Sequence, residues 1–274
     1  MTTPTHPEVP STKRSRIVVP VDPTRQPTAA VAVAGAIARQ ADLAVEIVAA
    51  GPGGAGIDAH LFERSREAER AGAPETSWRG LGAGDAADLV CESLLPDDVA
   101  LVCLATRSRG AVGELLLGSV ADAVVRRSPV PVLLVGPDVE PVERYRRLVV
   151  ALDGSELAER AGAVAVELAE RTATDVALLE VIADEPVPAD VAETAYLARY
   201  AAGLPDPPGR YDVVRSDRPG QAILDATAGA DDVVVVMGTH GRTALRRLVM
   251  GSVAHHVVQR ATAPVLVVPP TTTG

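Results

Sequence analysis

The sequence predicts an α/β protein made of two tandem domains, each built on a doubly wound parallel sheet. Three observations lead to this prediction: an internal repeat that spans nearly the whole chain, an alternation of strand and helix patterns within each copy, and strand-length runs that are apolar throughout. Such runs are typical of parallel sheets, because helices cover both faces. With 274 residues, the chain is long enough for two domains of ordinary size.

The repeat is clearest near the end of each half. The segment SRGAVGELLLGSVADAVVRRSPVPVLLV (108–135) matches GRTALRRLVMGSVAHHVVQRATAPVLVV (241–268), at a constant offset of 133 positions. The starts also match, since RIVVPVDPT (16–24) pairs with RLVVALDGS (147–155) at an offset of 131. We therefore predict domain 1 over 16–137 and domain 2 over 146–269, joined by a linker over 136–146 and preceded by a disordered, Pro/Thr-rich tail over 1–15.

The elements of domain 2 follow from the periodicity of its apolar residues. Strands are predicted where short runs are apolar, and helices where apolar residues recur three and four positions apart. Ser155 is a good N-cap for the first helix. In chain order the predicted elements are a strand over 148–152, a helix over 155–171, a strand over 175–182, a weaker helix over about 189–202, a strand over 211–214, a helix over 219–228, a strand over 233–237, a helix entered at 251–252 and a last strand over 265–268.

Composition and charge exclude several classes of function. The net charge is -10 and the basic residues are scattered, which argues against a nucleic-acid partner. No apolar run approaches the ~18 residues of a transmembrane helix, and the first residues lack the apolar stretch of a signal peptide. Cys91 and Cys103 form neither a CxxC pair nor a metal-ligand spacing, so we expect two buried, reduced thiols in a cytoplasmic protein.

Two segments of domain 2 follow strands whose carboxyl ends should meet at one edge of the sheet. Asp153-Gly154-Ser155 follows the first strand, and the stretch 238–253 leaves a buried strand at Gly238 and enters a helix at Gly251-Ser252. A helix start offers unpaired N–H groups and a positive dipole end, and glycines let the backbone approach phosphate oxygens and adopt positive φ. Arg242 adds charge-assisted donors. Ligands of doubly wound sheets bind where the winding reverses, so the sequence predicts a phosphate site there.

The spacing G-x2-G-x9-G-[ST], present as Gly238, Gly241, Gly251 and Ser252 after a buried strand, resembles the ATP-binding signature of the universal stress protein family. The resemblance covers nearly the whole chain as two tandem copies. It implies five-stranded, Rossmann-like domains of strand order 3-2-1-4-5 that form a pseudo-dimer by pairing their last strands, PVLLV (131–135) and PVLVV (264–268). It also implies binding of ATP or another adenine nucleotide, with any Mg²⁺ arriving through the nucleotide.

The same resemblance implies which residues bind. In domain 2 they are Asp153 and the backbone of Ala151 at the adenine or ribose, Val181 at the adenine, Gly238, Thr239, His240, Gly241 and Arg242 at the ribose and phosphates, and Gly251, Ser252 and Val253 at the phosphates. A weaker second site in domain 1 would comprise Asp22, Val48, Ala105, Ser108, Arg109, Gly118 and Ser119. Ala105 and Ser108 replace the two leading glycines there, and Pro23 replaces the glycine after the aspartate, so we expect domain 2 to hold the dominant site.

Plainer roles compete for these residues. Glycines also serve tight turns, and Asp153 and Ser252 also serve as helix caps. His255 and His256 are adjacent on a helix and diverge, so no metal site is predicted.

Three functions remain in view: a nucleotide-binding regulatory protein of the stress response, a nucleotide-independent interaction scaffold, and a slow ATP hydrolase. The sequence has no G-x4-G-K-[ST] loop and no G-x-S-x-G elbow, so fast catalysis is not expected. Homodimer formation stays an open alternative.

Overall fold

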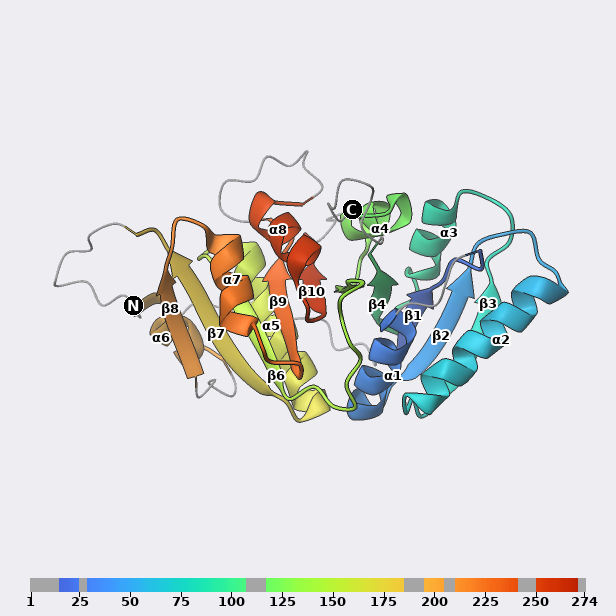
Figure 1. The fold of residues 1–274 in the computed structure, drawn as a ribbon, viewed down its shortest axis with the longest axis horizontal. Coiled ribbons are helices and arrows are strands. Elements are labelled where there is room, and N and C mark those ends of the chain that lie inside the picture. The colour runs from blue at the N-terminus through green and yellow to red at the C-terminus, as the bar shows by residue number, and fades with distance from the viewer. Residues whose placement is uncertain are drawn as a thin grey trace.

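One continuous sheet runs through both halves of the chain (Figure 1). The computed structural model describes residues 15–24, 29–106, 117–184, 195–204, 210–240 and 250–270. Their strands form a ten-stranded sheet in the order β3-β2-β1-β4-β5-β10-β9-β6-β7-β8. Domain 1 contributes β1 (Arg16–Pro20), β2 (Ala44–Ala49), β3 (Thr76–Gly80), β4 (Val99–Ala105) and β5 (Val132–Val135). Domain 2 contributes β6 (Arg147–Leu152), β7 (Asp175–Ile182), β8 (Arg210–Arg215), β9 (Val233–Gly238) and β10 (Val265–Val268).

Each half has the expected strand order 3-2-1-4-5, with parallel pairing throughout. The halves meet where β5 and β10 pair antiparallel, with Val265 opposite Leu134 and Val267 opposite Val132. The predicted pairing of the last strands is thus confirmed. Both strands are fully buried, so neither leaves an apolar sheet edge open to solvent.

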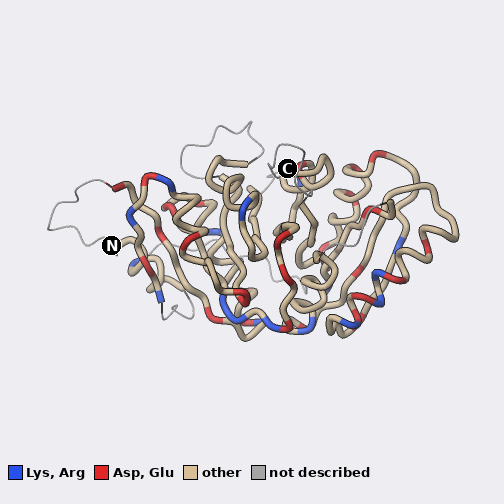
Figure 2. Tube along the Cα trace, in the orientation of Figure 1, with Lys and Arg blue, Asp and Glu red and all other residues tan. Residues whose placement is uncertain are grey.

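Helices cover both faces of the sheet, which explains why its central strands are apolar on both sides. One apolar cluster lies between the sheet and α1, α2, α5 and α6, and the other between the sheet and α3, α4, α7 and α8. In Figure 2 the charged residues lie on helices, connections and the outer strands, whereas the central strands β4, β5, β9 and β10 carry none. The helices are α1 (Ala29–Ala41), α2 (Ala55–Arg70), α3 (Ala86–Ser93), α4 (Ser119–Arg127), α5 (Glu156–Thr172), α6 (Ala195–Ala202), α7 (Pro219–Thr227) and α8 (Ser252–Arg260).

Element boundaries in domain 2 lie close to the predicted ones. The strands over 175–182 and 265–268 agree residue for residue, and α5 begins directly after its predicted N-cap, Ser155. The helix expected over 189–202 is α6, described only from Ala195, because 185–194 lie outside the described residues. The predicted tail lies outside them too, except Ser15, whose N–H donates to Asp98 O at 2.8 Å.

The segment that joins the domains is exposed over most of its length but is anchored to the protein by buried residues. Val139 and Tyr145 are buried, Tyr145 with 2% exposure. The Tyr145 N–H donates to Oε1 of Gln40 at 2.8 Å, and Nε2 of Gln40 donates to Tyr145 O at 2.8 Å and to Thr172 O at 3.3 Å. Gln40 lies on α1 and Thr172 ends α5, so one amide side chain ties both domains to the segment between them.

Candidate functional site

The candidate site in domain 2 lies where β6 and β9 end side by side. The two strands pair from Arg147 opposite Val233 to Val150 opposite Val236, and they continue to their ends at Leu152 and Gly238. In the order β8-β7-β6-β9-β10 the direction of winding reverses between β6 and β9. This is the position at which doubly wound sheets bind ligands.

The turn after β6 is held by its own side chains. Oδ1 of Asp153 accepts hydrogen bonds from the backbone N–H of Ser155 at 3.0 Å and from its hydroxyl at 2.6 Å. The same hydroxyl oxygen accepts from Ala158 N–H at 3.2 Å and so caps α5. Gly154 has a φ of 78°, a left-handed conformation that favours glycine. The turn therefore fixes the Asp153 carboxylate and satisfies the start of α5 at once.

Domain 1 repeats this turn with one difference. Oδ1 of Asp22 accepts from Thr24 N–H at 2.9 Å and from the Thr24 hydroxyl at 2.6 Å. Pro23 stands between them, and its ring fixes φ near about -65°. The backbone of domain 1 therefore cannot copy the conformation of Gly154 at this point.

The end of β9 is tied to the start of α8. Thr239 is fully buried; its N–H donates to Val268 O at 3.1 Å, and its carbonyl accepts from Gly251 N–H at 2.7 Å. The Thr239 hydroxyl is 3.0 Å from Nδ1 of His240. The helix start is thus placed beside the strand end by a direct backbone bond. The intervening residues 241–249, among them the predicted Gly241 and Arg242, lie outside the described residues.

Helix α8 begins without a side chain that caps its first N–H groups. Gly251 is the N-cap and has no side chain, and the exposed Ser252 opens the helix. The first intrahelical bond runs from His255 N–H to Gly251 O at 2.9 Å, so the N–H groups of Ser252 and Val253 precede it. The start of α4 in domain 1 has the same form at Gly118 and Ser119. Both helix starts present N–H donors and a positive dipole end, which suits an anion.

Two glycines of the predicted site, Gly238 and Gly251, lie within the described residues, and neither has a positive φ. Gly251 has φ -64° and ψ 154°, a conformation open to any residue, so of the two advantages of glycine considered above, positive φ is not used there. Gly238 is not among the glycines with positive φ either. Instead, a Cβ at Gly238 would lie 3.0 Å from Leu157 Cγ and 3.3 Å from Ala158 N. Gly238 therefore allows close approach of β9 to the first turn of α5.

The remaining predicted residues divide by exposure. Ala151, Val181 and Val253 are partly buried and pack on the apolar cluster beneath α7 and α8. Val48, expected in the weaker site, is fully buried, and its carbonyl accepts from Val21 N–H at 2.8 Å. Ser108 and Arg109 lie outside the described residues.

Thr106 was not identified from the sequence, although the repeat offset of 133 points to it as the counterpart of Thr239. Its N–H donates to Val135 O at 2.9 Å, as Thr239 does to Val268. Ala105, just before it, ends β4 at the position that Gly238 occupies in β9.

The described residues form neither a metal cluster nor a membrane-spanning helix. No group of three or more His, Cys, Asp or Glu side chains there is arranged to hold a metal ion. No helix in the described part of the chain has the length and apolarity needed to span a bilayer.

The fold, with the starts of α4 and α8 each placed beside the end of a central strand, defines a tandem, doubly wound α/β protein. The model of the universal stress protein family matches residues 13–136 and 144–269, so the chain belongs to the universal stress protein family.

The chain is also similar to individual proteins. A universal stress protein of Mycobacterium tuberculosis (strain H37Rv) is 31% identical over 188 residues, which are 63% of this chain and 63% of that protein. The match thus spans less than two thirds of that relative. The crystal structure of a universal stress protein from Archaeoglobus fulgidus covers 94% of this chain and 99% of its own at 19% identity, with a TM-score of 0.65, and shares the fold. A universal stress protein solved in complex with cAMP covers 46% of this chain and 99% of its own at 29% identity, with a TM-score of 0.38.

Proposed function

We propose that domain 2 binds an adenine nucleotide, ATP foremost, at the ends of β6 and β9, and that the bound nucleotide regulates the protein in a stress response rather than feeding a fast reaction. The observation that carries this proposal is the 2.7 Å bond from Gly251 N–H to Thr239 O, which fixes the start of α8 beside the strand end. A glycine N-cap leaves the first N–H groups of that helix to a ligand.

Each part of the site has a chemical role in this proposal. The N–H groups of Ser252 and Val253 and the Ser252 hydroxyl bind phosphate oxygens, with Gly241 and Arg242 completing the phosphate contacts. The Asp153 carboxylate, oriented by Ser155, accepts from a ribose hydroxyl or the adenine amine. Ala151 and Val181 line the adenine. Magnesium, when present, arrives on the phosphates.

The sharpest variant is Ser252→Pro. Proline suits the first position of a helix, and Gly251 already has the extended conformation that a residue before proline needs. The substitution removes one N–H and one hydroxyl from the ligand and spares the helix. We expect ATP affinity to fall roughly 100-fold or more, because each of the two lost donors is worth about 1.5–3 kcal/mol to a charged group.

Ser119→Pro is the matched control, because Gly118 has φ -62° and ψ 155°, nearly the same as Gly251. Calorimetric titration of nucleotide-stripped protein should show one tight site per chain, lost in Ser252→Pro and kept in Ser119→Pro. Loss of the tight site in Ser119→Pro instead would assign the dominant site to domain 1 and contradict the proposal.

Chromatography of nucleotides released by boiling the purified protein identifies the ligand among ATP, AMP and cAMP. No released nucleotide and no binding heat would favour the interaction scaffold. Conversion of ATP to ADP over hours, abolished by Ser252→Pro, would favour the slow hydrolase.

A further inference from the structure

The free sheet edge of domain 1 carries exposed aromatic side chains that the proposed function leaves unused. Strand β3 ends the sheet and is exposed over most of its length. Trp78 on β3 is 40% exposed, and Phe62 on the neighbouring α2 is 50% exposed. They are the single Trp and the single Phe of the chain. Tryptophan in exposed positions is enriched at binding interfaces.

The backbone of β3 alternates between the sheet and the open edge. Val45 N–H donates to Glu75 O at 2.9 Å, and Leu81 N–H donates to Ala49 O at 2.8 Å. Because the direction of the backbone groups alternates along a strand, the backbone groups of Ser77 and Arg79 also face β2. The N–H and C=O groups of Thr76, Trp78 and Gly80 therefore point outward, as a template for another strand.

The opposite edge, β8, is protected by charge. Arg210 and Asp212 form an ion pair at 3.0 Å on the strand itself, and Arg215 follows at its end. Such charges discourage pairing with another sheet. The one charged residue of β3, Arg79, instead turns inward.

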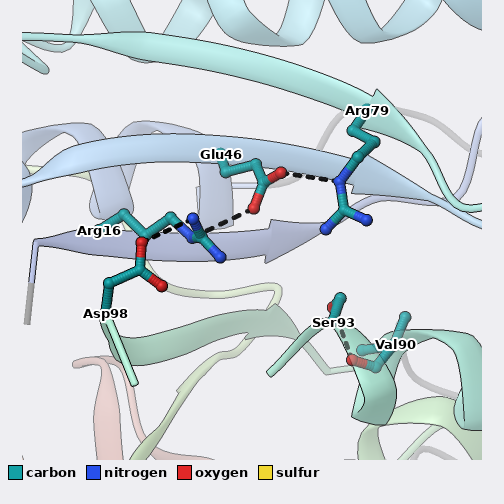
Figure 3. A network of polar contacts seen from close by, with 6 residues as sticks. All are labelled: Arg16, Glu46, Arg79, Val90, Ser93 and Asp98. Atoms are coloured by element: carbon teal, nitrogen blue, oxygen red, sulfur yellow. Dashed lines mark hydrogen bonds and ion pairs between the residues drawn. The ribbon is translucent and has the colours of Figure 1, made fainter. Parts of the chain in front are cut away.

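Figure 3 shows where Arg79 is held. Its Nε forms an ion pair with Oε1 of Glu46 at 3.0 Å, and the other carboxylate oxygen of Glu46 lies 3.3 Å from Nε of Arg16. Nη1 of Arg16 in turn forms an ion pair with Oδ2 of Asp98 at 2.7 Å. The ion pair with Glu46 uses Nε, so the two terminal guanidinium nitrogens keep donors for a further carboxylate. Glu75, an exposed residue just before β3, makes no ion pair within the described part of the chain.

We propose that β3 pairs antiparallel with β3 of a second copy of this chain, about a twofold axis at Ser77. This register places Thr76 opposite Trp78 of the second copy, so the outward backbone groups bond one another. It also places Glu75 opposite Arg79 of the second copy, which forms two new ion pairs by symmetry. Charge complementarity thus selects this register.

Apolar contact adds to the pairing on the other face of the sheet. Trp78 is opposite Ile47, whose side chain belongs to the apolar cluster beneath α1 and α2. The Trp78 ring therefore lies on the α2 side of the sheet. Glu69 of α2 accepts from the Thr76 hydroxyl at 2.9 Å, and Phe62 lies two turns earlier on the same side of α2. Both aromatic rings therefore flank the edge and lose solvent exposure when the second copy pairs.

Sedimentation equilibrium of the full chain tests the proposal over about 1 to 100 µM, the range expected for a small interface. The mass should rise toward twice 28.3 kDa. Fluorescence of Trp78, the single tryptophan, should shift to shorter wavelength over the same range. Glu75→Lys should raise the dimer Kd roughly tenfold, because it replaces two ion pairs by repulsion. Trp78→Pro, which removes an outward N–H, should abolish dimers.

Two matched controls complete the design. Tyr211→Pro makes the same change at an exposed aromatic residue of the other edge strand, and Glu170→Lys reverses an exposed charge on α5. Both should dimerise like the parent chain. A parent chain that stays monomeric at about 100 µM, an unchanged Kd in Glu75→Lys, or dissociation by Tyr211→Pro would each overturn the proposal. Glu75→Lys decides alone if Trp78→Pro fails to fold by circular dichroism.

Discussion

Gln40→Ala is expected to be among the most damaging substitutions at the junction between the domains. The Gln40 amide is the hydrogen-bond partner of both backbone groups of Tyr145, with 2.8 Å for each bond. Tyr145 has 2% exposure, so water has little access to its backbone once the amide is gone. The substitution therefore leaves a buried donor and a buried acceptor without partners.

The cost follows from those two groups. A buried polar group left without its partner costs about 1–3 kcal/mol, so the pair should cost about 2–4 kcal/mol after partial relaxation. The longer bond to Thr172 O, at 3.3 Å, adds little. Against a typical total of about 5–15 kcal/mol, this is a large fraction of the free energy of unfolding.

Urea denaturation followed by two probes measures both the cost and its location. Far-ultraviolet circular dichroism reports on both domains, whereas fluorescence of the single tryptophan, Trp78, reports on domain 1. In Gln40→Ala both midpoints should fall, and any separation between them should stay small, because the β5–β10 pairing still couples the domains. Arg39→Ala is the control, since its exposed side chain also bonds the linker, at Glu143 O. A free energy of unfolding for Gln40→Ala within about 0.5 kcal/mol of the parent would refute the reasoning.

Four further outcomes are expected. Gly251→Ala should fold normally by circular dichroism, since φ is -64° there. Gly238→Val should lower the free energy of unfolding by about 1–3 kcal/mol through overpacking against α5, and should also lose ATP binding. Equal stabilities of the two variants would contradict the roles assigned to these glycines. Glu46→Ala should lose about 1–3 kcal/mol in urea denaturation, because Glu46 is 8% exposed between two arginines, and no change would show that those contacts are dispensable. Burial lowers the pKa of His256, so the contribution of the neutral imidazole to the free energy of unfolding is complete above about pH 6.5 and is lost as the pH falls. His256→Asn should therefore flatten the acid side of a plot of melting temperature against pH. Burial raises the pKa of the Cys103 thiol, so thiol reagents should modify it only after unfolding, and rapid modification of the native protein would contradict its burial.

The fold was predictable because its signals are long. A repeat over more than a hundred positions and strands that are apolar at every residue, such as β9, leave few alternatives to a doubly wound parallel sheet. The pairing of β5 with β10 followed from the family resemblance and from the apolar character of both strands, which would be costly as free edges.

The finer roles were not predictable because they depend on contacts between distant residues. The spacing of Gly251 gave no way to learn its φ, and the need for Gly238 arises from Leu157, far away in sequence. The burial of Tyr145 in a charged, proline-containing linker could not be predicted either, because it depends on Gln40, more than a hundred positions away, as the partner of its backbone. The exposure that separates Val181 from Val48 likewise depends on neighbouring strands and not on residue type.

The junction between β5 and β10 has a consequence for how the two halves can differ. Were the halves two identical polypeptides, any change near the twofold axis would appear on both sides. Joined in one chain, each half is free to take on features of its own. Glu46, opposite Val18 in domain 1, corresponds to Ala177, opposite Val149 in domain 2, so domain 2 has no carboxylate at the position from which Glu46 makes the network of Figure 3. Tandem fusion thus permits division of labour, in which one half keeps the proposed ligand site and the other carries the proposed contact with a second copy.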